Sequence, residues 1–425
     1  MIASSLIRDD ARAIWMAAID AVRPERLVSE HSASHDLLAA CDGCKRIVVV
    51  GAGKAAAGMA AGVEAALGAQ RIARHRMTGL VSVPEGCGRA LSAIEVRETR
   101  PAGLNLPTPR VVEATLEMLD LVSSLEAGDV VIAVIAGGGS ALLAAPRPGI
   151  TLEQKIAVTT RLSKSGASIA ELNAARCTMS RVKGGGLARA CTAGRLMVLV
   201  LSDVIGDDLD VIASGPCMPS EPGSAGCWRT DTGCRVRHMI LGDNATAVTA
   251  ARAEASRRGY DIIPATIPAE AAAEIVGSRL ATEGVAAVAR SASDGRPRAI
   301  IGGGEATVRV PADHGTGGRN QQTVLAAIDT QQRGGSPWPV GLLVASVGTD
   351  GEDGPTDAAG AVADSGVVAE IGARRLDVSG VLARCDAYPF FAAVGGLIRT
   401  GQTGTNVADL RLALARGETP DAALA

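Results

Sequence analysis

Three glycine-rich turns between Gly302 and Ala361 constrain the fold of this chain more than any other feature. They read GGGEATVRV, GTGGRNQQ and SVGTDGEDGPTDAAGA, and apolar runs at Ala299–Ile301 and Val340–Ala345 lead into the first and the last of them. Strands that end in glycines are typical of α/β sheets, whose carboxyl-end loops bind ligands. The alternative is that the glycines only turn the chain and the charges are solvated. Three such turns in one stretch favour a site.

The same arrangement of strand, glycine turn and helix opens the first half. Arg46–Val50 predicts a buried strand, and it leads through Gly51, Gly53 and Lys54 into an alanine-rich helix. The turn is not a P-loop, because the spacing to the first glycine and the residue after the lysine are wrong. It fits G-x-G-x-x-A, a weak dinucleotide fingerprint. Lys54 either lies beside an anion at the helix N-terminus or points into solvent.

A second unit of this kind follows at Asp129–Ala136. This apolar strand leads into Gly137, Gly138, Gly139 and Ser140, and then into a helix. The backbone N–H and hydroxyl of Ser140 could bind an oxyanion, or Ser140 could simply cap the helix.

Two later segments carry charges at places where a ligand could bind. Arg176 and Lys183 lie before three glycines and either hold an anion or belong to an amphipathic surface. Asp203 and Asp207 follow the strand Leu196–Leu201, and carboxylates there suit Mg²⁺ or a polar loop.

Alternating strand and helix patterns predict an α/β protein. We expect a Rossmann-like, doubly wound parallel sheet in residues 1–235 and a three-layer α/β/α domain in residues 236–425. The second half is expected to open with a strand near His238–Leu241 and to end with a helix over Thr405–Leu414.

Composition excludes several classes of function. A net charge of −3 and the absence of a basic face argue against a nucleic-acid partner. No apolar run approaches the roughly 20 residues of a membrane span, and the N-terminus does not read as a signal peptide. Nine scattered cysteines indicate reduced thiols, and Cys41 with Cys44 forms a CxxC for which a polar turn is favoured over a metal or redox role. We therefore expect a soluble cytoplasmic protein, and the sequence leaves a homodimer open.

Seven motifs in their order along the chain resemble the D-glycerate 2-kinase family, whose members also carry the label hydroxypyruvate reductase in tartrate degradation. They run from about residue 46 to 410 and read GAGK, AGGGSALL, SDVIGDDLDVIASGP, GGGEATV, GTGGRNQ, GTDGEDGPTDAAGA and GQTGTNVADL. The resemblance includes the C-terminal domain described as a multi-organism fragment rich in leucine. It implies two α/β domains, an active site in the cleft between them, and phosphorylation of the 2-hydroxyl of D-glycerate with ATP and Mg²⁺.

The resemblance assigns roles to individual residues. It makes Lys54 and Arg319 catalytic, and in-line phosphoryl transfer needs such cations more than covalent help. Asp203 is a further catalytic candidate. The expected metal ligands are Asp207, Glu305 and Asp350, with Asp353 and Asp357 as weaker ones. Substrate or phosphate binding is expected from a larger set: Gly51, Gly53, Gly138, Gly139, Ser140, Arg176, Lys183 and Asn320.

The chain departs from the family pattern in its first half. Leu106 stands where a histidine is expected and Arg110 where an aspartate is expected, while Cys177-Thr178 replaces a Lys-His pair and Gly186 an arginine. These changes suggest an altered acceptor or a loss of kinase activity. Three hypotheses follow: a kinase for D-glycerate or a similar hydroxy acid, an NAD(P)H-dependent hydroxypyruvate reductase, and a non-catalytic protein that binds hydroxy acids or nucleotides. The first requires the fewest coincidences.

Overall fold

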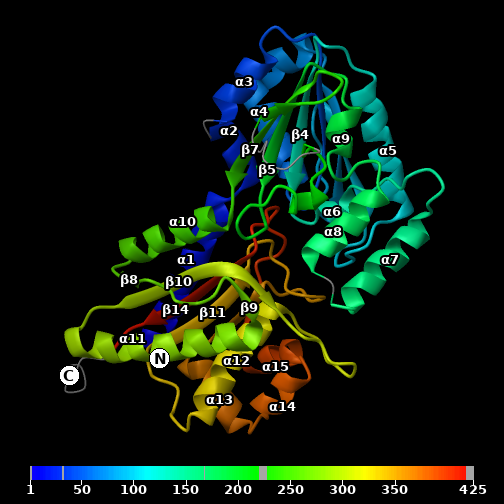
Figure 1. Ribbon diagram of the computed structural model, residues 1–425. Coiled ribbons are helices and arrows are strands. Elements are labelled where there is room, and N and C mark those ends of the chain that lie inside the picture. The colour runs from blue at the N-terminus through cyan, green and yellow to red at the C-terminus, as the bar shows by residue number, and fades with distance from the viewer. Residues whose placement is uncertain (1, 31–32, 167, 220–226, 418–425) are drawn as a thin grey trace. The chain divides into compact units, whose positions relative to one another are not determined.

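The structure, a computed structural model, describes residues 2–30, 33–166, 168–219 and 227–417, and they form two compact units (Figure 1). The N-terminal unit comprises Val22–Asp243 and Gly404–Val407. The C-terminal unit comprises Met1–Ala21, Asn244–Thr403 and Ala408–Ala425. Each unit has its own sheet and its own apolar core, as separate domains do.

The sheet of the N-terminal unit has the strand order β3-β2-β1-β4-β5-β7-β6 in the described residues. Every neighbouring pair is parallel except β6 with β7. The strands are β1 (Ile47–Ala52), β2 (Thr78–Pro84), β3 (Ile94–Arg100), β4 (Val130–Ala136), β5 (Arg195–Leu201), β6 (Cys227–Arg229) and β7 (Arg235–Gly242). β1 and β4 are fully buried apolar strands, as expected for a parallel sheet with helices on both faces.

Helices cover both faces of this sheet (Figure 1). One face carries α2 (Pro24–Glu30), α3 (Ala33–Cys41) and α4 (Ala56–Arg74); the other carries α5 (Pro109–Ser123) and α9 (Gly186–Ala190). Four short elements follow the carboxyl ends of β4 and β5: α6 (Gly139–Leu142), α7 (Leu152–Lys164), α8 (Ile169–Thr178) and the 3₁₀ turn η1 (Ile212–Ser214). Both α7 and α8 begin with a capping box, which fixes where they start.

The sheet of the C-terminal unit is mixed. Its order is β13-β12-β11-β14-β10-β8, with β9 paired to β10, and β14 runs antiparallel between β10 and β11. The strands are β8 (Asp261–Ile263), β9 (Glu270–Ala272), β10 (Arg298–Thr307), β11 (Leu342–Gly348), β12 (Gly360–Ala363), β13 (Leu397–Ile398) and β14 (Asp409–Ala415).

This second sheet also lies between helices (Figure 1). One face carries α1 (Ile2–Ala21) and α10 (Asn244–Arg257), and the other carries α11 (Ala273–Asp294) and α12 (Arg319–Arg333). Three short helices complete the α12 side: α13 (Ser365–Ala373), α14 (Val378–Ala383) and α15 (Ala387–Val394). The protein is therefore α/β in both halves, as predicted.

The predicted helix over Thr405–Leu414 is wrong. Asp409–Ala415 is strand β14, buried along its whole length between two other strands. The periodicity of a short apolar run does not distinguish a buried strand from a buried helix. Here the run forms a strand because it pairs with β10 on one side and β11 on the other.

The units also differ from the predicted division at residue 235. β7 pairs in parallel with β5, so the strand expected to open the second half completes the first sheet. α1 packs on α10 and β14 in the C-terminal unit, because its apolar face is buried there. The first 21 residues therefore belong with the C-terminal unit.

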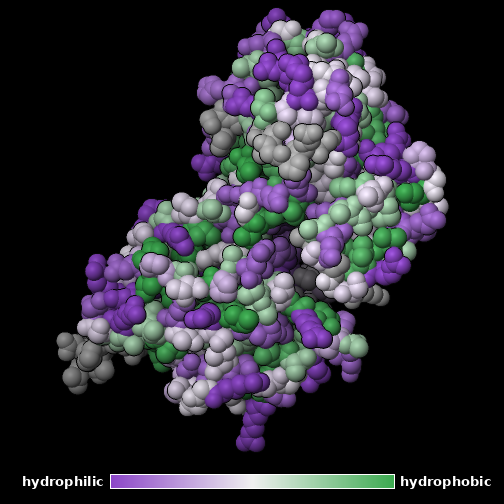
Figure 2. Space-filling model, in the orientation of Figure 1, coloured by the Kyte–Doolittle hydropathy of each residue, from purple (hydrophilic) through white to green (hydrophobic). Residues whose placement is uncertain are grey.

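No helix in the part of the chain that the structure describes is long and apolar enough to cross a membrane. On the face drawn in Figure 2, hydrophilic and apolar residues are interspersed over both units.

Candidate active site

The loops after β1 and β4 meet at the point where the strand order of the first sheet reverses. In open α/β sheets ligands bind at this switch point, outside the carboxyl ends of the strands. Gly51, near the end of β1, and Gly53, in the loop after it, are both packed closely against β4. A Cβ on Gly51 would stand 2.0 Å from the carbonyl oxygen of Val134, and one on Gly53 would stand 2.5 Å from that of Ala136. Gly51 and Gly53 thus allow the end of β1 and the loop after it to approach β4.

Two predicted catalytic residues lie beside the second glycine loop. The backbone N–H of Lys54 donates to the carbonyl of Gly137 at 2.9 Å, and the Lys54 side chain passes 3.6 Å from where a Cβ on Gly138 would stand. Asp203 also lies against this loop, where its carboxylate would clash with any side chain at Gly137 and accepts a hydrogen bond from Asn406 at 3.2 Å. The N-terminal unit therefore brings Lys54 and Asp203 to one loop.

A pocket of about 190 Å³ opens next to this loop within the N-terminal unit. Four predicted binding residues line it together: Gly138, Ser140, Arg176 and Lys183. Gly139 is buried under the loop, against Ala213. The pocket lining also includes Asn105, Leu106, Pro107, Ala141, Lys155, Ile156 and Thr159.

The pocket lining contains three basic side chains and no carboxylate among the described residues. Burial, and then the charge of Arg176, lowers the pKa of Lys155 to about 8. Burial likewise lowers the pKa of Arg176. Their contacts are with neutral groups: Lys155 Nζ lies 3.4 Å from the carbonyl oxygen of Arg176, and Arg176 Nη1 donates to Asn173 Oδ1 at 3.2 Å. Such cations favour an anionic ligand.

The departures from the family pattern fall at different places. Leu106 lines the pocket, so the missing histidine changes the pocket wall itself. Cys177 is not among the residues that line the pocket, and its Sγ lies 3.9 Å from the carbonyl oxygen of Ser214. Arg110 and Thr178 are exposed and line no part of the pocket. A Cβ at Gly186 would stand 2.1 Å from the carbonyl oxygen of Arg181, so the loop here has no room for the expected arginine.

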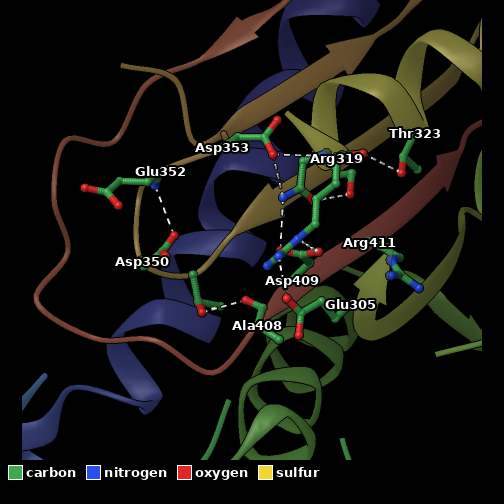
Figure 3. A network of polar contacts seen from close by, with 12 residues as sticks. Glu305, Arg319, Thr323, Asp350, Glu352, Asp353, Ala408, Asp409 and Arg411 are labelled. Atoms are coloured by element: carbon green, nitrogen blue, oxygen red, sulfur yellow. Dashed lines mark hydrogen bonds and ion pairs between the residues drawn. The ribbon is translucent and has the colours of Figure 1, made fainter. Parts of the chain in front are cut away.

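In the C-terminal unit, Arg319 is the first residue of α12 and its guanidinium is held by two carboxylates (Figure 3). Nε and Nη2 bind the two oxygens of Asp409 at 2.8 and 3.0 Å, and Nη1 binds Glu305 at 2.5 Å. Asp409 is fully buried, whereas nearly half of the Glu305 side chain is exposed. Burial works against the charged guanidinium, but the charges of Asp409 and Glu305 prevail and raise the pKa of Arg319. Arg319 is thus a cation whose exposed partner could be exchanged for another anion.

Asn320, predicted to bind substrate or phosphate, lies inside the same network. It is buried; its Nδ2 donates to Asp409 and Asp353 at 3.0 and 3.3 Å, and its Oδ1 accepts from Ser346. Asp353 caps α12 by accepting from the backbone N–H groups of Asn320 and Gln321 at 2.9 and 2.8 Å. The network therefore fixes the start of α12 and, with it, the position of Arg319.

The three predicted metal ligands are not one cluster. Asp207 belongs to the N-terminal unit, where burial and the neighbouring Asp243 raise its pKa. Glu305 pairs with Arg319, and Asp350 accepts the backbone N–H of Glu352 at 3.0 Å (Figure 3). Within the described ranges no group of three or more His, Cys, Asp or Glu side chains could hold a metal ion. Two weaker candidates are also engaged elsewhere, since Asp353 caps α12 and Asp357 pairs with Arg399.

Sequence reasoning missed several residues at these sites. Lys155 lies on α7, and the rarity of lysine is the one signal in the sequence that could have found it, because the chain has 5 lysines against 37 arginines. Ser214 lies 41 residues from Asn173, and Asp409 lies 90 residues from Arg319, so no local pattern connects these pairs.

Comparisons with known proteins agree with this architecture. A family model described as "Domain of unknown function (DUF4147)" matches residues 10–250, and the MOFRL family model matches residues 298–409. The bovine protein named glycerate kinase is 33% identical, with 96% of this chain and 93% of the relative covered. The D-glycerate 2-kinase of Thermotoga maritima is also 33% identical, with 93% and 95% covered. A crystal structure of glycerate kinase from Thermotoga maritima superposes with a TM-score of 0.78 at 31% identity, covering 97% of this chain and all of that one.

The fold and the matched models define the class, a two-unit α/β protein with a DUF4147 half and a MOFRL half. The similarity to whole relatives is more specific. The chain belongs to the glycerate kinase family.

Proposed function

We propose that this protein is a glycerate 2-kinase, which transfers the terminal phosphoryl group of ATP to the 2-hydroxyl of D-glycerate or of a closely related small hydroxy acid. The observation that carries the proposal is the basic pocket of the N-terminal unit, in a chain that is similar to D-glycerate 2-kinases along nearly its whole length. A small hydroxy acid has a carboxylate for the cations and a hydroxyl for the polar wall.

Different residues of the pocket are suited to different groups of the substrate. Arg176 and Lys155 are suited to the substrate carboxylate, because their present partners are neutral oxygens that a carboxylate can replace. Ser140 and the backbone at Gly138 face the same pocket and suit the hydroxyl end. With the substrate bound in this orientation, the acceptor hydroxyl would lie next to the loop that Lys54 packs against.

Lys54 and Arg319 are the cations we assign to phosphoryl transfer. The transferred group carries its charge on oxygens, and fixed cations stabilise that charge without covalent chemistry. Lys54 is part of the β1 loop at the switch point of the first sheet. We propose that turnover requires both residues and that Asp203, at the same loop as Lys54, is a third requirement.

Mg²⁺ is the metal that this chemistry suggests, and Asp207 with Asp243 fits it best. Mg²⁺ is commonly held by one or two carboxylates together with substrate phosphates, so a cluster of three protein ligands is not needed. The raised pKa of Asp207 reflects its burial and its repulsion by Asp243, and a divalent cation would relieve that repulsion. When bound, the ion would neutralise charge on the phosphates of ATP.

Purified protein, Mg²⁺-ATP and a panel of C3 and C4 hydroxy acids test the proposal by ADP release. Product from D-glycerate should be consumed directly by enolase, which requires the 2-phosphate, whereas a 3-phosphate would need a mutase first. Lys54→Ala and Arg319→Ala should lose turnover, and Arg110→Gln, an exposed arginine outside the pocket, is the matched control. ATP-independent oxidation of NAD(P)H by hydroxypyruvate would instead support the reductase. Binding of hydroxy acids without turnover would indicate a non-catalytic relative.

The acceptor panel matters because Leu106 alters the pocket wall. A leucine neither donates nor accepts a hydrogen bond, so this wall is less polar than the family histidine would make it. We therefore include hydroxy acids with an additional methyl or methylene group beside D-glycerate. We also propose a cytoplasmic location, because all nine cysteines are free thiols.

A further inference from the structure

Lys183 is a buried lysine whose amine contacts only neutral groups in the described residues. Its side chain reaches the pocket wall, yet only 2% of the residue is exposed. Nζ donates to the carbonyl oxygen of Ala213 at 3.1 Å and lies 3.4 Å from Ser214 Oγ. A buried ammonium without a carboxylate partner is costly, so this environment favours the neutral amine.

Ser214 connects this amine to the pocket. Ser214 is fully buried, and its Oγ lies 2.9 Å from the Oγ of Ser140, which lines the pocket. The Ser214 hydroxyl also donates to Asn173 Oδ1 at 2.9 Å. Hydrogen-bonding distances therefore join Lys183 Nζ, Ser214 Oγ and Ser140 Oγ in one chain that ends at the pocket.

The backbone at Ser214 is held in a costly conformation. Ala213 and Ser214 have φ values of 53° and 61°, in the left-handed region that side chains disfavour. Such residues persist where the surroundings fix them, and they gather at functional sites. Here the conformation places the Ser214 hydroxyl among Ser140, Asn173 and Lys183.

The charged and titratable neighbours of Lys183 act mainly in one direction. Burial lowers the pKa of Lys183 well below its ordinary value, and the charges of Lys155 on α7 and Arg176 on α8 lower it further. Cys177 on α8 opposes them, but burial raises the pKa of its thiol and keeps that thiol protonated. A lysine that is desolvated beside other cations holds its proton less tightly than an exposed lysine, so its neutral amine becomes available as a base.

We propose that Ser140, Ser214 and Lys183 form a proton relay that takes the proton from the acceptor hydroxyl during phosphoryl transfer. The inference rests on the proposed kinase function and adds the residues that accept the proton. Lys183 acts through the two hydroxyls and is the final acceptor rather than a clamp for the substrate carboxylate.

The step balances without an additional reactant. The acceptor oxygen forms its bond to phosphorus as the bond between phosphorus and the leaving oxygen breaks, and ADP departs with that electron pair. The acceptor proton passes to Ser140 Oγ, the Ser140 proton passes to Ser214 Oγ, and the Ser214 proton passes to Lys183 Nζ. For this, the Ser214 hydroxyl turns from Asn173 to Lys183.

Three variants and one control test the relay in the full-length protein with ATP and the best acceptor of the panel. Lys183→Met and Ser214→Ala should lower kcat about 100-fold, within the usual range for proton transfer, while KM changes little. Ser140→Ala, a change at the partly exposed end of the relay, should lower kcat with the fold intact. Ser124→Ala, at an exposed helix end, is the matched control.

The pH profile and chemical rescue show whether Lys183 acts as a base or as a permanently charged cation. In the wild type, kcat should fall at acid pH as Lys183 becomes protonated, and this limb should be absent in Lys183→Met. Ethylamine should rescue Lys183→Ala in proportion to its free-base concentration, whereas guanidinium should not. If Lys183→Arg is active, or if guanidinium rescues as well as ethylamine, Lys183 is a fixed cation and the relay is overturned.

A measurement that needs no turnover completes the test. Because the chain has five lysines, protein labelled with ¹³C at lysine Cε should give five resolved signals, and loss of one in Lys183→Met assigns it. The Lys183 signal should titrate well below that of the exposed Lys45, and Ser214→Ala should shift it. A Lys183 that stays protonated up to the titration of Lys45 overturns the relay. If the wild type is active and Lys183→Met is equally active, the relay alone is overturned. If the wild type releases no ADP with any acceptor, both the kinase proposal and the relay are overturned.

Discussion

Arg319 and Asp409, 90 residues apart in the sequence, form a two-point ion pair in which both carboxylate oxygens bind the guanidinium. Asp409 begins β14 and Arg319 begins α12, so the pair connects the central strand of the second sheet to the helix that covers it. Glu305 on β10 binds the same guanidinium from a more exposed position (Figure 3). The two partners therefore differ in burial although they share one cation.

This difference predicts unequal effects of two isosteric substitutions. Asp409→Asn should lower the free energy of unfolding by about 3 kcal/mol, because it leaves a largely buried guanidinium short of a charge partner. Glu305→Gln should cost at most about 1 kcal/mol, since solvent screens the exposed pair. Urea unfolding of both variants provides the comparison, and equal losses would contradict the assigned burial.

The glycine before Arg319 is required by a close approach. A Cβ on Gly318 would stand 2.2 Å from Asp353 Cγ, so Gly318→Ala should displace the carboxylate that caps α12. We expect a loss of about 2–4 kcal/mol, the range for overpacking combined with loss of a cap. Gly372→Ala on α13 is the control, because nothing lies within 4 Å of its Cβ position and alanine favours a helix. A similar melting temperature for both variants would argue against the close approach.

The raised pKa of Asp353 should make the free energy of unfolding depend on pH. Burial raises its pKa to about 7, while in the unfolded chain it titrates near 4. The folded state therefore holds this proton more tightly, and its contribution to stability, present below about pH 4, should be lost as the pH rises to about 7. In Asp353→Asn the free energy of unfolding should fall less between pH 5 and pH 7.5 than in the wild type. Parallel curves for the two proteins would show that another group controls this range.

The lowered pKa of Lys155 should set the pH above which kcat/KM for the hydroxy acid declines. Because its pKa lies at about 8, the free enzyme loses this pocket cation above that pH, and kcat/KM for the hydroxy acid should then decline. Lys155→Arg should keep kcat/KM more constant up to pH 9.5, since a guanidinium remains charged. Initial rates across this pH range are the measurement. An identical decline of kcat/KM in both proteins would contradict the proposal that Lys155 binds the substrate carboxylate.

Much of the first unit could be predicted from the sequence. Glycine turns after the apolar strands β1 and β4 predict a parallel sheet with a candidate site at its carboxyl edge, at Lys54 and Ser140. A later segment before three glycines predicts Arg176 and Lys183 as further candidates. The strands and turns of this sheet could be predicted because strand ends, glycines and helix starts are adjacent in the chain. The division of the chain at residue 235 could not be refined in this way, because only strand pairing assigns β7 to the first sheet.

The sequence by itself determined the α/β class, the switch-point loops and the family, since these depend on local patterns and on ordered motifs. Only the tertiary structure decided that Asp409–Ala415 is a central strand, that Lys155 joins the pocket, and that Ser214 connects Lys183 to Ser140. The physical reason is distance along the chain. A buried charge or hydroxyl acquires its chemical role from partners that folding brings to it from tens of residues away.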